Sequence, residues 1–346
     1  MPKPIAGGWV HFGGPDRPPR LLRDLLARRI EAVPEGGEIA WATYYFRDMA
    51  LAEALMAASD RGVRVVLHVE GAPRRRSAND AVVTRLEKHG LNGGLNVHEP
   101  LLEALAPFHG HLHAKIYAFS HPEPTVLVGS FNPSGNDPED PDVIAEIGDQ
   151  DRGHNMLVEY RNPGLVATLR RHVLELDRPA PRFRPHENHV FEGAFASLYF
   201  YPRLRTGIID KALHGLGSGT TIRGVISHLK PGFLSRGLAK AARAGAEVRL
   251  IVHDTERRVP EAIIDELAEA GVAIARYRHP QALPVHSKFL LIDRIGGRAA
   301  WFGSFNYNPR SRWLNREILL RSEDPALREA LAERFDLIAG ETAGFG

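Results

Sequence analysis

The stretch VHSKFLLIDRIGGRAAWFGSFNYNPRSRWLNRE, residues 285–317, decides the fold and carries most of the candidate chemistry. His286 and Lys288 are two residues apart, so on a strand both side chains leave the same face. A mostly apolar run follows, and then a glycine-containing turn opens the next segment. The other polar residues that we single out in the stretch are Asp293, Ser304, Asn306 and Glu317.

These residue types suit a phosphate site. Lys288 supplies a cation, and Ser304 and Asn306 supply neutral hydrogen-bond donors. The imidazole of His286 is the group best able to attack, or to release a proton, near neutral pH. We expect Glu317 to orient this imidazole. The stretch therefore predicts a catalytic site that acts on a phosphate group.

The order of these residues is similar to that of a known family. His-x-Lys, four residues, Asp, then Gly-Ser-x-Asn and a later Glu resembles the histidine-lysine-aspartate signature of the phospholipase D superfamily. The tail GSFNYNPRSRWLNRE is most similar to the cardiolipin synthase branch. The resemblance implies phosphodiester chemistry without a metal or other cofactor, and a supporting role for Asp293.

Length and composition set the class. With 346 residues the chain is long enough for two domains, and 43% hydrophobic and 25% charged residues are typical of a soluble globular protein. There is no cysteine, which excludes disulfides and thiolate metal sites. No stretch approaches the ~18 apolar residues of a membrane span, and the start of the chain lacks a signal-like apolar run. We expect a cytoplasmic protein, with peripheral membrane contact as a further expectation.

The chain contains two copies of one pattern. Residues 38–46 form a strand-like run, followed by a helical pattern that ends at Gly62 and by a buried strand. Residues 221–253 repeat this order, with Gly245 in the place of Gly62, and each copy then delivers a His-x-Lys. The pattern predicts an α/β fold of two tandem phospholipase D-like domains, each a mixed, mainly parallel sheet flanked by helices.

A proline-rich segment, PAPRFRPHEN at residues 179–188, separates the copies and disfavours regular structure. We place an N-terminal domain at residues 1–178 and a C-terminal domain at residues 189–346. The resemblance implies a pseudo-two-fold arrangement in which both signatures meet at one shared site. The oligomeric state stays open.

The first copy keeps the phosphate-binding set, since His113 and Lys115 are followed by Ser130 and Asn132. Its supporting residues differ. Ser120 stands where the second copy has Asp293.

The carboxylate position of the first copy also differs. Leu157 occupies the position of Glu317 if Asn155 is matched to Asn315. Glu159 would share that face and is the candidate to compensate.

Two charged segments lie near the signatures. Residues 132–153 carry seven acidic residues and one Arg, which we interpret as a solvated acidic loop that repels long polyanions. The run of arginines at residues 74–76 is interpreted as a solvated loop, with contact to phosphate or a lipid headgroup as the alternative. The 44 basic and 42 acidic residues give a net charge of +2, which is weak support for a nucleic-acid partner.

The run HGHLH places His109, His111 and His113 on one face if it is a strand. A metal site is one interpretation. We expect no metal here, because His113 belongs to the signature and the sequence offers no third ligand type. The aromatic residues near the signatures are assigned mostly to the core, with an apolar entrance for acyl chains as the alternative: Tyr44, Tyr45, Phe46, Phe108, Phe131, Phe305 and Trp313.

Two His, two Lys and two Asn at one site fit a two-step phosphoryl transfer. One His attacks phosphorus to form a phosphohistidine, and the other protonates the leaving alcohol. The family often uses the first His, but we expect His286 to attack because Glu317 can hold it. The leading hypothesis is hydrolysis or transfer of phosphatidyl groups on a phospholipid substrate. The alternatives are a nuclease, and a non-enzymatic scaffold with a degenerate first signature.

Overall fold

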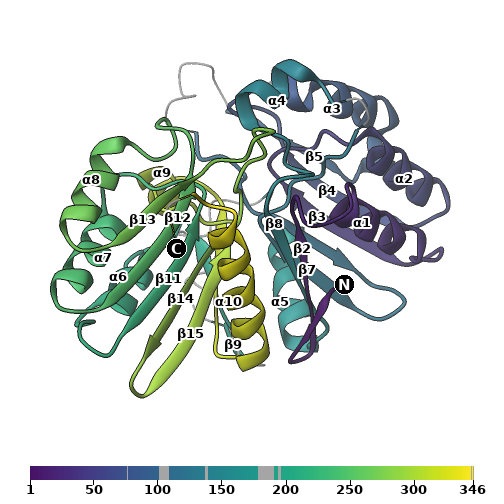
Figure 1. The fold of residues 1–346 in the computed structure, drawn as a ribbon. Coiled ribbons are helices and arrows are strands. Elements are labelled where there is room, and N and C mark those ends of the chain that lie inside the picture. Colours follow the sequence, from purple (N-terminus) through teal and green to yellow (C-terminus); the bar gives the residue numbers. More distant parts are fainter. Residues whose placement is uncertain are drawn as a thin grey trace.

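The computed structural model describes residues 1–75, 77–100, 109–136, 139–177, 191–193, 196–343 and 345. Two sheets stand side by side, and the described strands of each come from one half of the chain (Figure 1). The first sheet has the order β1-β2-β8-β7-β6-β3-β4-β5. Its strands are β1 (Lys3–Ile5), β2 (Gly8–Gly13), β3 (Glu38–Thr43), β4 (Arg64–Glu70), β5 (Leu95–His98), β6 (Ile116–Phe119), β7 (Thr125–Gly129) and β8 (Asn155–Tyr160).

The second sheet has the order β13-β12-β11-β14-β15-β16-β10-β9. Read from its other end, this order repeats the first sheet strand for strand, so the structure confirms that the two halves are copies of one fold. Its strands are β9 (Phe191–Gly193), β10 (Ala196–Tyr201), β11 (Thr221–Ile226), β12 (Glu247–His253), β13 (Ala273–Tyr277), β14 (Lys288–Arg294), β15 (Gly297–Gly303) and β16 (Glu317–Ser322).

The sheets are mixed, as predicted, but the expectation that they are mainly parallel is wrong. Among the described strands, only β3-β4, β4-β5, β11-β12 and β12-β13 pair in parallel. The strand-helix-strand pattern seen in the sequence accounts for these pairs. The signature strands instead form antiparallel hairpins, β6-β7 and β14-β15, and β8 and β16 pair antiparallel beside them. The other described pairings are antiparallel as well.

The helices form outer and inner layers. In the first half they are α1 (Leu21–Glu31), α2 (Met49–Asp60), α3 (Ser77–His89), α4 (Pro141–Ile147) and α5 (Pro163–Leu174), with a 3₁₀ turn η1 (Gly90–Gly93). In the second half they are α6 (Ile208–Leu213), α7 (Phe233–Arg243), α8 (Glu261–Glu269), α9 (Pro309–Trp313) and α10 (Pro325–Gly340). Helices α5 and α10 lie between the two sheets, whereas α1–α3 and α6–α8 cover their outer faces (Figure 1).

Helix α2 shows how the local sequence sets these boundaries. The Asp48 carboxylate accepts a hydrogen bond from Leu51 N at 2.8 Å, which satisfies one free amide of the first turn. Leu51 and Leu55 are fully buried against the sheet. The chain leaves the helix through Gly62, whose φ of 85° favours glycine.

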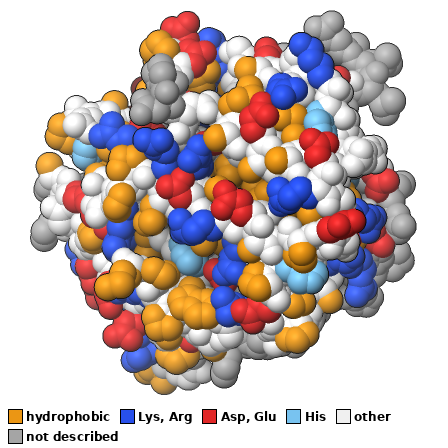
Figure 2. Space-filling model, turned by 90° about the vertical axis from the view of Figure 1, so that its right-hand side faces the viewer, with side chains coloured by type: hydrophobic (Ala, Val, Ile, Leu, Met, Phe, Trp, Pro, Cys, Tyr) orange, Lys and Arg blue, Asp and Glu red, His pale blue; other side chains and the backbone are white. Residues whose placement is uncertain are grey.

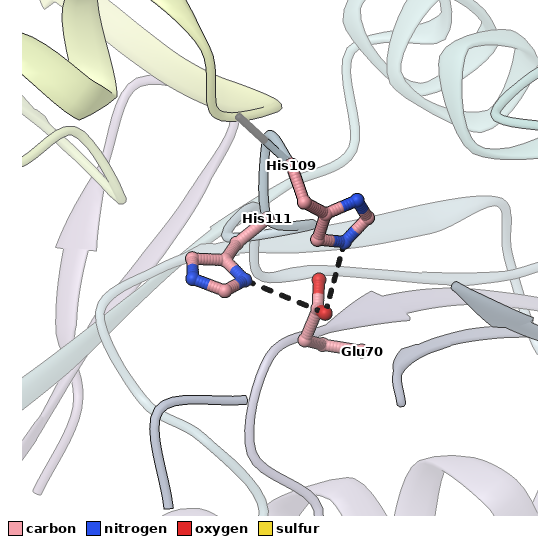
Figure 3. A group of neighbouring side chains, drawn as sticks. All are labelled: Glu70, His109 and His111. Atoms are coloured by element: carbon pink, nitrogen blue, oxygen red, sulfur yellow. Dashed lines mark hydrogen bonds and ion pairs between the residues drawn. The ribbon is translucent and has the colours of Figure 1, made fainter. Parts of the chain in front are cut away.

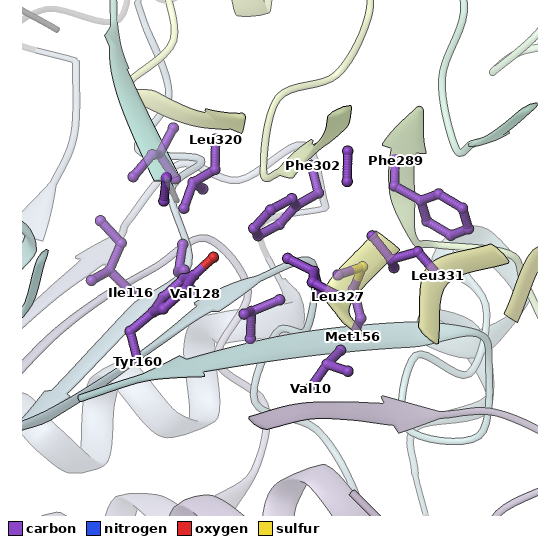
Figure 4. Close-up of a cluster of buried hydrophobic side chains, with 14 of the residues drawn as sticks. Val10, Ile116, Val128, Met156, Tyr160, Phe289, Phe302, Leu320, Leu327 and Leu331 are labelled. Atoms are coloured by element: carbon purple, nitrogen blue, oxygen red, sulfur yellow. The ribbon is translucent and has the colours of Figure 1, made fainter. Parts of the chain in front are cut away.

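One hydrophobic core crosses from half to half. Val10, Met156 and Tyr160 of the first sheet belong to the same buried cluster as Phe289 and Phe302 of the second (Figure 4). Helix α10 also contacts β1. The two halves are therefore packed against one another, which fixes the relative positions of the loops at their adjoining ends.

The predicted linker, residues 179–188, lies outside the described residues, so the domain boundary stays a prediction. Among the residues that the structure places, no helix is both long and apolar enough to cross a bilayer.

Candidate active site

The two His-x-Lys segments meet where the halves adjoin. The amide of His113 donates to the carbonyl of Arg316 at 2.9 Å, and the amide of His286 donates to the carbonyl of His154 at 2.9 Å. Each histidine segment is thus held by the backbone of the opposite half. Short parallel bridges, Leu112 with Arg316 and His154 with Val285, make the same connection.

The imidazoles are also held across the interface. His113 Nδ1 lies 2.8 Å from Glu317 Oε2, and His286 Nδ1 lies 3.0 Å from Asn155 Oδ1. Our expectation that Glu317 orients His286 is therefore wrong. Glu317 belongs to the same half as His286, but its strand, β16, presents it to the histidine of the other half. The reason given for His286 as the attacking group falls with this finding.

Strand register shows which residues correspond. Gly129 pairs with Leu157 and Gly303 pairs with Leu319, so Leu157 corresponds to Leu319. The counterpart of Glu317 is therefore Asn155, two residues earlier than the sequence match had placed it.

Glu159 does not compensate. Its carboxylate pairs with His11 at 3.0 Å and with Arg29, and none of these three residues lines the cavity described below.

The two serines stand behind the imidazoles. Ser304 Oγ donates to Glu317 Oε2 at 2.6 Å, and Ser130 Oγ donates to Asn155 Oδ1 at 3.0 Å. Both serines are fully buried, and their amide groups donate to the carbonyls of Met156 and Ile318. We predicted that these hydroxyls bind phosphate. The structure engages them in fixing the partners of the histidines instead.

The glycine before each serine is required by close backbone approach. A Cβ at Gly129 would lie 2.2 Å from the carbonyl oxygen of Met156, and one at Gly303 would lie 2.4 Å from that of Ile318. Any side chain at either position would push β7 from β8 or β15 from β16. The glycine of each Gly-Ser pair thus allows the close strand packing that places Glu317 and Asn155 beside the imidazoles.

Both lysines are buried beneath the histidines. Lys115 Nζ donates to the carbonyl of His113 at 2.6 Å, and Lys288 Nζ donates to that of His286 at 2.7 Å. Burial lowers the pKa of Lys115 to about 7, and burial together with the charge of Lys115 holds that of Lys288 well below its usual value. A bound phosphate anion would offset this penalty, because it adds a negative charge to that of Glu317.

The histidines are uncharged at rest. Burial lowers the pKa of His113 to about 4, although Glu317 opposes the shift. Burial, and then the charges of Lys288 and Arg258, hold the pKa of His286 well below its usual range. Burial alone would raise the pKa of Glu317, but His113 and Lys115 lower it below its usual value. At neutral pH the site therefore contains an ionised carboxylate and two neutral imidazoles.

A cavity of about 280 Å³ opens above the imidazoles. It is lined by Tyr44, Tyr45, Arg74, His111, His113, Asn132, Ile147, Gln150, His228, Arg257, Arg258, His286, Asn306, Asn308, Arg310 and Asn315. The predicted phosphate ligands Asn132 and Asn306 are thus brought together with both histidines. The sequence reasoning missed His228, Arg258, Gln150 and Asn155. The first two follow the carboxyl ends of β11 and β12, where functional loops gather, and this was the available signal.

Asp293 lies elsewhere. Its carboxylate is 3.0 Å from Arg328 on α10 and 3.9 Å from Arg223. It stands five residues along β14 from Lys288, roughly 17 Å at the rise of a strand. Asp293 therefore supports the packing of α10 on the sheet and does not line the cavity.

The acidic segment is only partly the solvated loop that we predicted. It includes α4, and Ile147 and Gln150 line the cavity, whereas Asp140 and Asp142 are exposed to solvent. Asn132 Nδ2 donates to Gln150 Oε1 at 2.7 Å. Glu146 pairs with Arg74 and Arg75, so part of the arginine run is neutralised within the fold, and Arg76 lies outside the described residues.

Stability is expected to fall as the pH drops from about 6.5 to about 4. Burial lowers the pKa of His68 and of His253 to about 4, from 6.5 when exposed. In this pH range the two histidines are protonated in the unfolded chain but not in the folded chain. The free energy of unfolding therefore falls by roughly 1.4 kcal/mol per pH unit for each such group. Urea unfolding at pH 7 and pH 5 measures this. Equal or greater stability at pH 5 would contradict it.

The repeated sheets and the facing His-x-Lys pairs define the phospholipase D superfamily. Within it, the family described as "Cardiolipin synthase, PLD-like domain" matches residues 35–140 and 217–338, and the chain belongs to this family. Cardiolipin synthase A of Buchnera aphidicola is 36% identical over 104 residues. This match spans 29% of the present chain and 20% of that protein.

Two solved structures share the fold over nearly the whole chain. Phosphatidylserine synthase of Haemophilus influenzae has a TM-score of 0.66 at 14% identity, with 98% of this chain and 88% of that chain covered. Polyphosphate kinase of Porphyromonas gingivalis has a TM-score of 0.61 at 16% identity, with 95% of this chain and 50% of that chain covered. At these identities the likeness concerns the fold.

Proposed function

We propose that the protein transfers or hydrolyses the phosphatidyl group of a phospholipid through a phosphohistidine on His113. The observation that carries the proposal is the hydrogen bond of 2.8 Å between His113 Nδ1 and the Glu317 carboxylate, opposite His286 in one cavity. A carboxylate on Nδ1 fixes the tautomer that leaves the Nε2 lone pair free. It also stabilises the positive charge that develops on the ring during attack.

In the first step, Nε2 of His113 forms a bond to phosphorus while the bond from phosphorus to the leaving oxygen breaks. His286 Nε2 donates the proton that turns the leaving oxygen into an alcohol. In the second step, His286 takes a proton from water or from an acceptor alcohol, whose oxygen attacks phosphorus and releases His113. The charge on the phosphoryl oxygens is offset by Lys115 and Lys288, and the same oxygens accept hydrogen bonds from Asn132 and Asn306.

His286 must carry a second proton before it can act as the acid. In the free protein its low pKa disfavours this, and its partner Asn155 is neutral. A bound phosphate diester brings a negative charge into the site and so raises the pKa of the imidazole. Substrate binding thereby favours the protonated form of His286 that the acid role needs.

A lipid substrate is supported by the family and by the charge pattern. Positive and negative side chains alternate with apolar ones on the face seen in Figure 2, and the net charge is only +2. Nucleic-acid enzymes usually present a basic groove with interleaved aromatic residues. Glu146 neutralises part of the charge of Arg74 and Arg75 beside the cavity, which weakens the attraction of this edge for a long polyanion.

The test uses purified protein with mixed micelles of phosphatidylglycerol, with and without 1-butanol. A phosphohistidine intermediate partitions between water and the alcohol, so phosphatidylbutanol should form at the expense of phosphatidic acid. Single-stranded DNA, added in a parallel assay, should stay intact. Cleavage of DNA with untouched lipid would replace the lipid assignment by the nuclease alternative and leave the histidine mechanism standing.

A further inference from the structure

A second cluster of ionisable side chains lies beside the catalytic histidines. Glu70 ends β4, and His109 and His111 alternate in the segment that leads to His113 (Figure 3). His109 Nε2 lies 3.2 Å from Glu70 Oε1, and His111 Nδ1 lies 3.4 Å from the same oxygen. The sequence showed the alternating histidines but no third ligand. The fold supplies one, Glu70, from 39 residues earlier in the chain.

The spacing of the three atoms fits a metal ion. Zinc bonds to His nitrogen and carboxylate oxygen measure about 2.0–2.2 Å, so the tetrahedral angle places neighbouring ligand atoms roughly 3.3–3.6 Å apart. The two distances measured from Glu70 Oε1 come close to this range. The third separation, between the two histidine nitrogens, is no more than 4.8 Å. Binding of one ion by all three requires the two histidine nitrogens to lie within roughly 3.6 Å of each other.

The carboxylate is fixed from behind. Glu70 is fully buried, and its Oε2 accepts a hydrogen bond from Leu112 N at 2.6 Å. Its Oε1 accepts another from Ala72 N at 3.1 Å. Such outer hydrogen bonds orient a ligand and are typical of metal sites.

The two histidines are held by the second half of the chain. Arg310 donates to the carbonyl of His109 at 2.6 Å, and the amide of His111 donates to Asn315 Oδ1 at 3.2 Å. His111 Nδ1 is buried, and although it lies near Glu70 it makes no hydrogen bond of good geometry. A buried imidazole nitrogen without a hydrogen bond, aimed at a carboxylate, has the arrangement of a metal ligand.

We propose that Glu70, His109 and His111 bind one divalent transition-metal ion of the Zn²⁺ class. Two histidines and one glutamate are a ligand set that leaves a coordination position open. His111 also lines the cavity that contains His113, and the ring of Tyr44 packs near both imidazoles, with centroids 5.5 Å from His111 and 4.9 Å from His113. The open position would bind a substrate oxygen that is not attached to the reacting phosphorus. Lys115 and Lys288 would interact with the oxygens on the phosphorus itself.

Metal binding is measured directly, without reliance on activity. The full-length protein, stripped with a chelator, is titrated with Co²⁺ and followed by its visible absorption, and zinc content is then determined after addition of Zn²⁺ and gel filtration. We expect about one ion per chain. The variants His109→Ala and Glu70→Gln should each weaken binding at least about tenfold, since loss of a direct ligand exceeds the loss of an outer partner.

Two matched variants locate the ion. His113→Ala removes a neighbouring imidazole outside the cluster, and His214→Ala removes an exposed one at the end of α6, so both should bind Co²⁺ as the native protein does. His109 is partly exposed and its replacement should leave the fold intact, which thermal unfolding verifies. Absence of stoichiometric binding, or binding that survives both His109→Ala and Glu70→Gln, would overturn the proposal and leave a hydrogen-bonded cluster only.

Discussion

His113→Ala is expected to reduce turnover by at least about 10³-fold and to abolish the covalent adduct, because the attacking nitrogen is lost. Phospholipid labelled at phosphorus, mixed with enzyme and quenched in base, should leave label on the native protein and none on this variant. In His286→Ala the adduct should still form slowly and then persist, since the group that activates the acceptor is missing.

The exposed His214 provides the control, and His214→Ala should retain native turnover and labelling. Comparison of His113→Ala with His286→Ala also shows which of the two histidines attacks phosphorus. Label that survives in His113→Ala and disappears in His286→Ala would assign the attack to His286, and the proposed roles would then be reversed.

Glu317→Gln is expected to slow turnover by about tenfold to a hundredfold, as loss of an orienting partner typically does. Glu317 accepts from Ser304 Oγ and Ser311 Oγ at 2.6 Å each, so a glutamine can keep much of this geometry while losing the charge. The positive charge that develops on the His113 ring then lacks its counter-charge. The loss should fall on kcat, with KM nearly unchanged, and on the rate of adduct formation.

Glu159→Gln is the matched control, because sequence matching placed Glu159 near the equivalent strand position and the structure places it with His11 and Arg29. It should keep the native kcat, with any effect confined to stability. Native kinetics in Glu317→Gln would show that the carboxylate is not the orienting group. Rescue by Glu317→Asp, even in part, would support a role for charge rather than for packing.

Local patterns predicted much of the fold and the central chemistry. The two His-x-Lys segments, the two Asn residues and the repeated strand-helix-strand order were readable because each depends on residues close in the chain. The strand direction was misjudged because β8 and β16 return from a distance and pair with hairpins. The match of Asn155 to Asn315 was wrong because it relied on residue identity, whereas the register is set by the carbonyls of Met156 and Ile318.

Contacts between the halves were beyond the reach of sequence reasoning. Glu317 reaches His113 over 204 positions, and Asn155 reaches His286 over 131. Neither spacing has a local signal, since both depend on how α5 and α10 space the two sheets. The ligand-like position of Glu70 was invisible for the same reason, because it depends on where β4 ends relative to a later segment.

Because the two histidines have different partners, the structure determines on which side of the site the alcohol leaves and enters. If the ring held by Glu317 attacks, in-line displacement puts the departing alcohol on the opposite side, beside the ring held by Asn155. His228 and Arg258 stand in the cavity wall with His286, and the acceptor must enter where the alcohol left. The choice of headgroup would then be made by the second half of the chain, and exchanging residues there should change which alcohol is released and which is accepted.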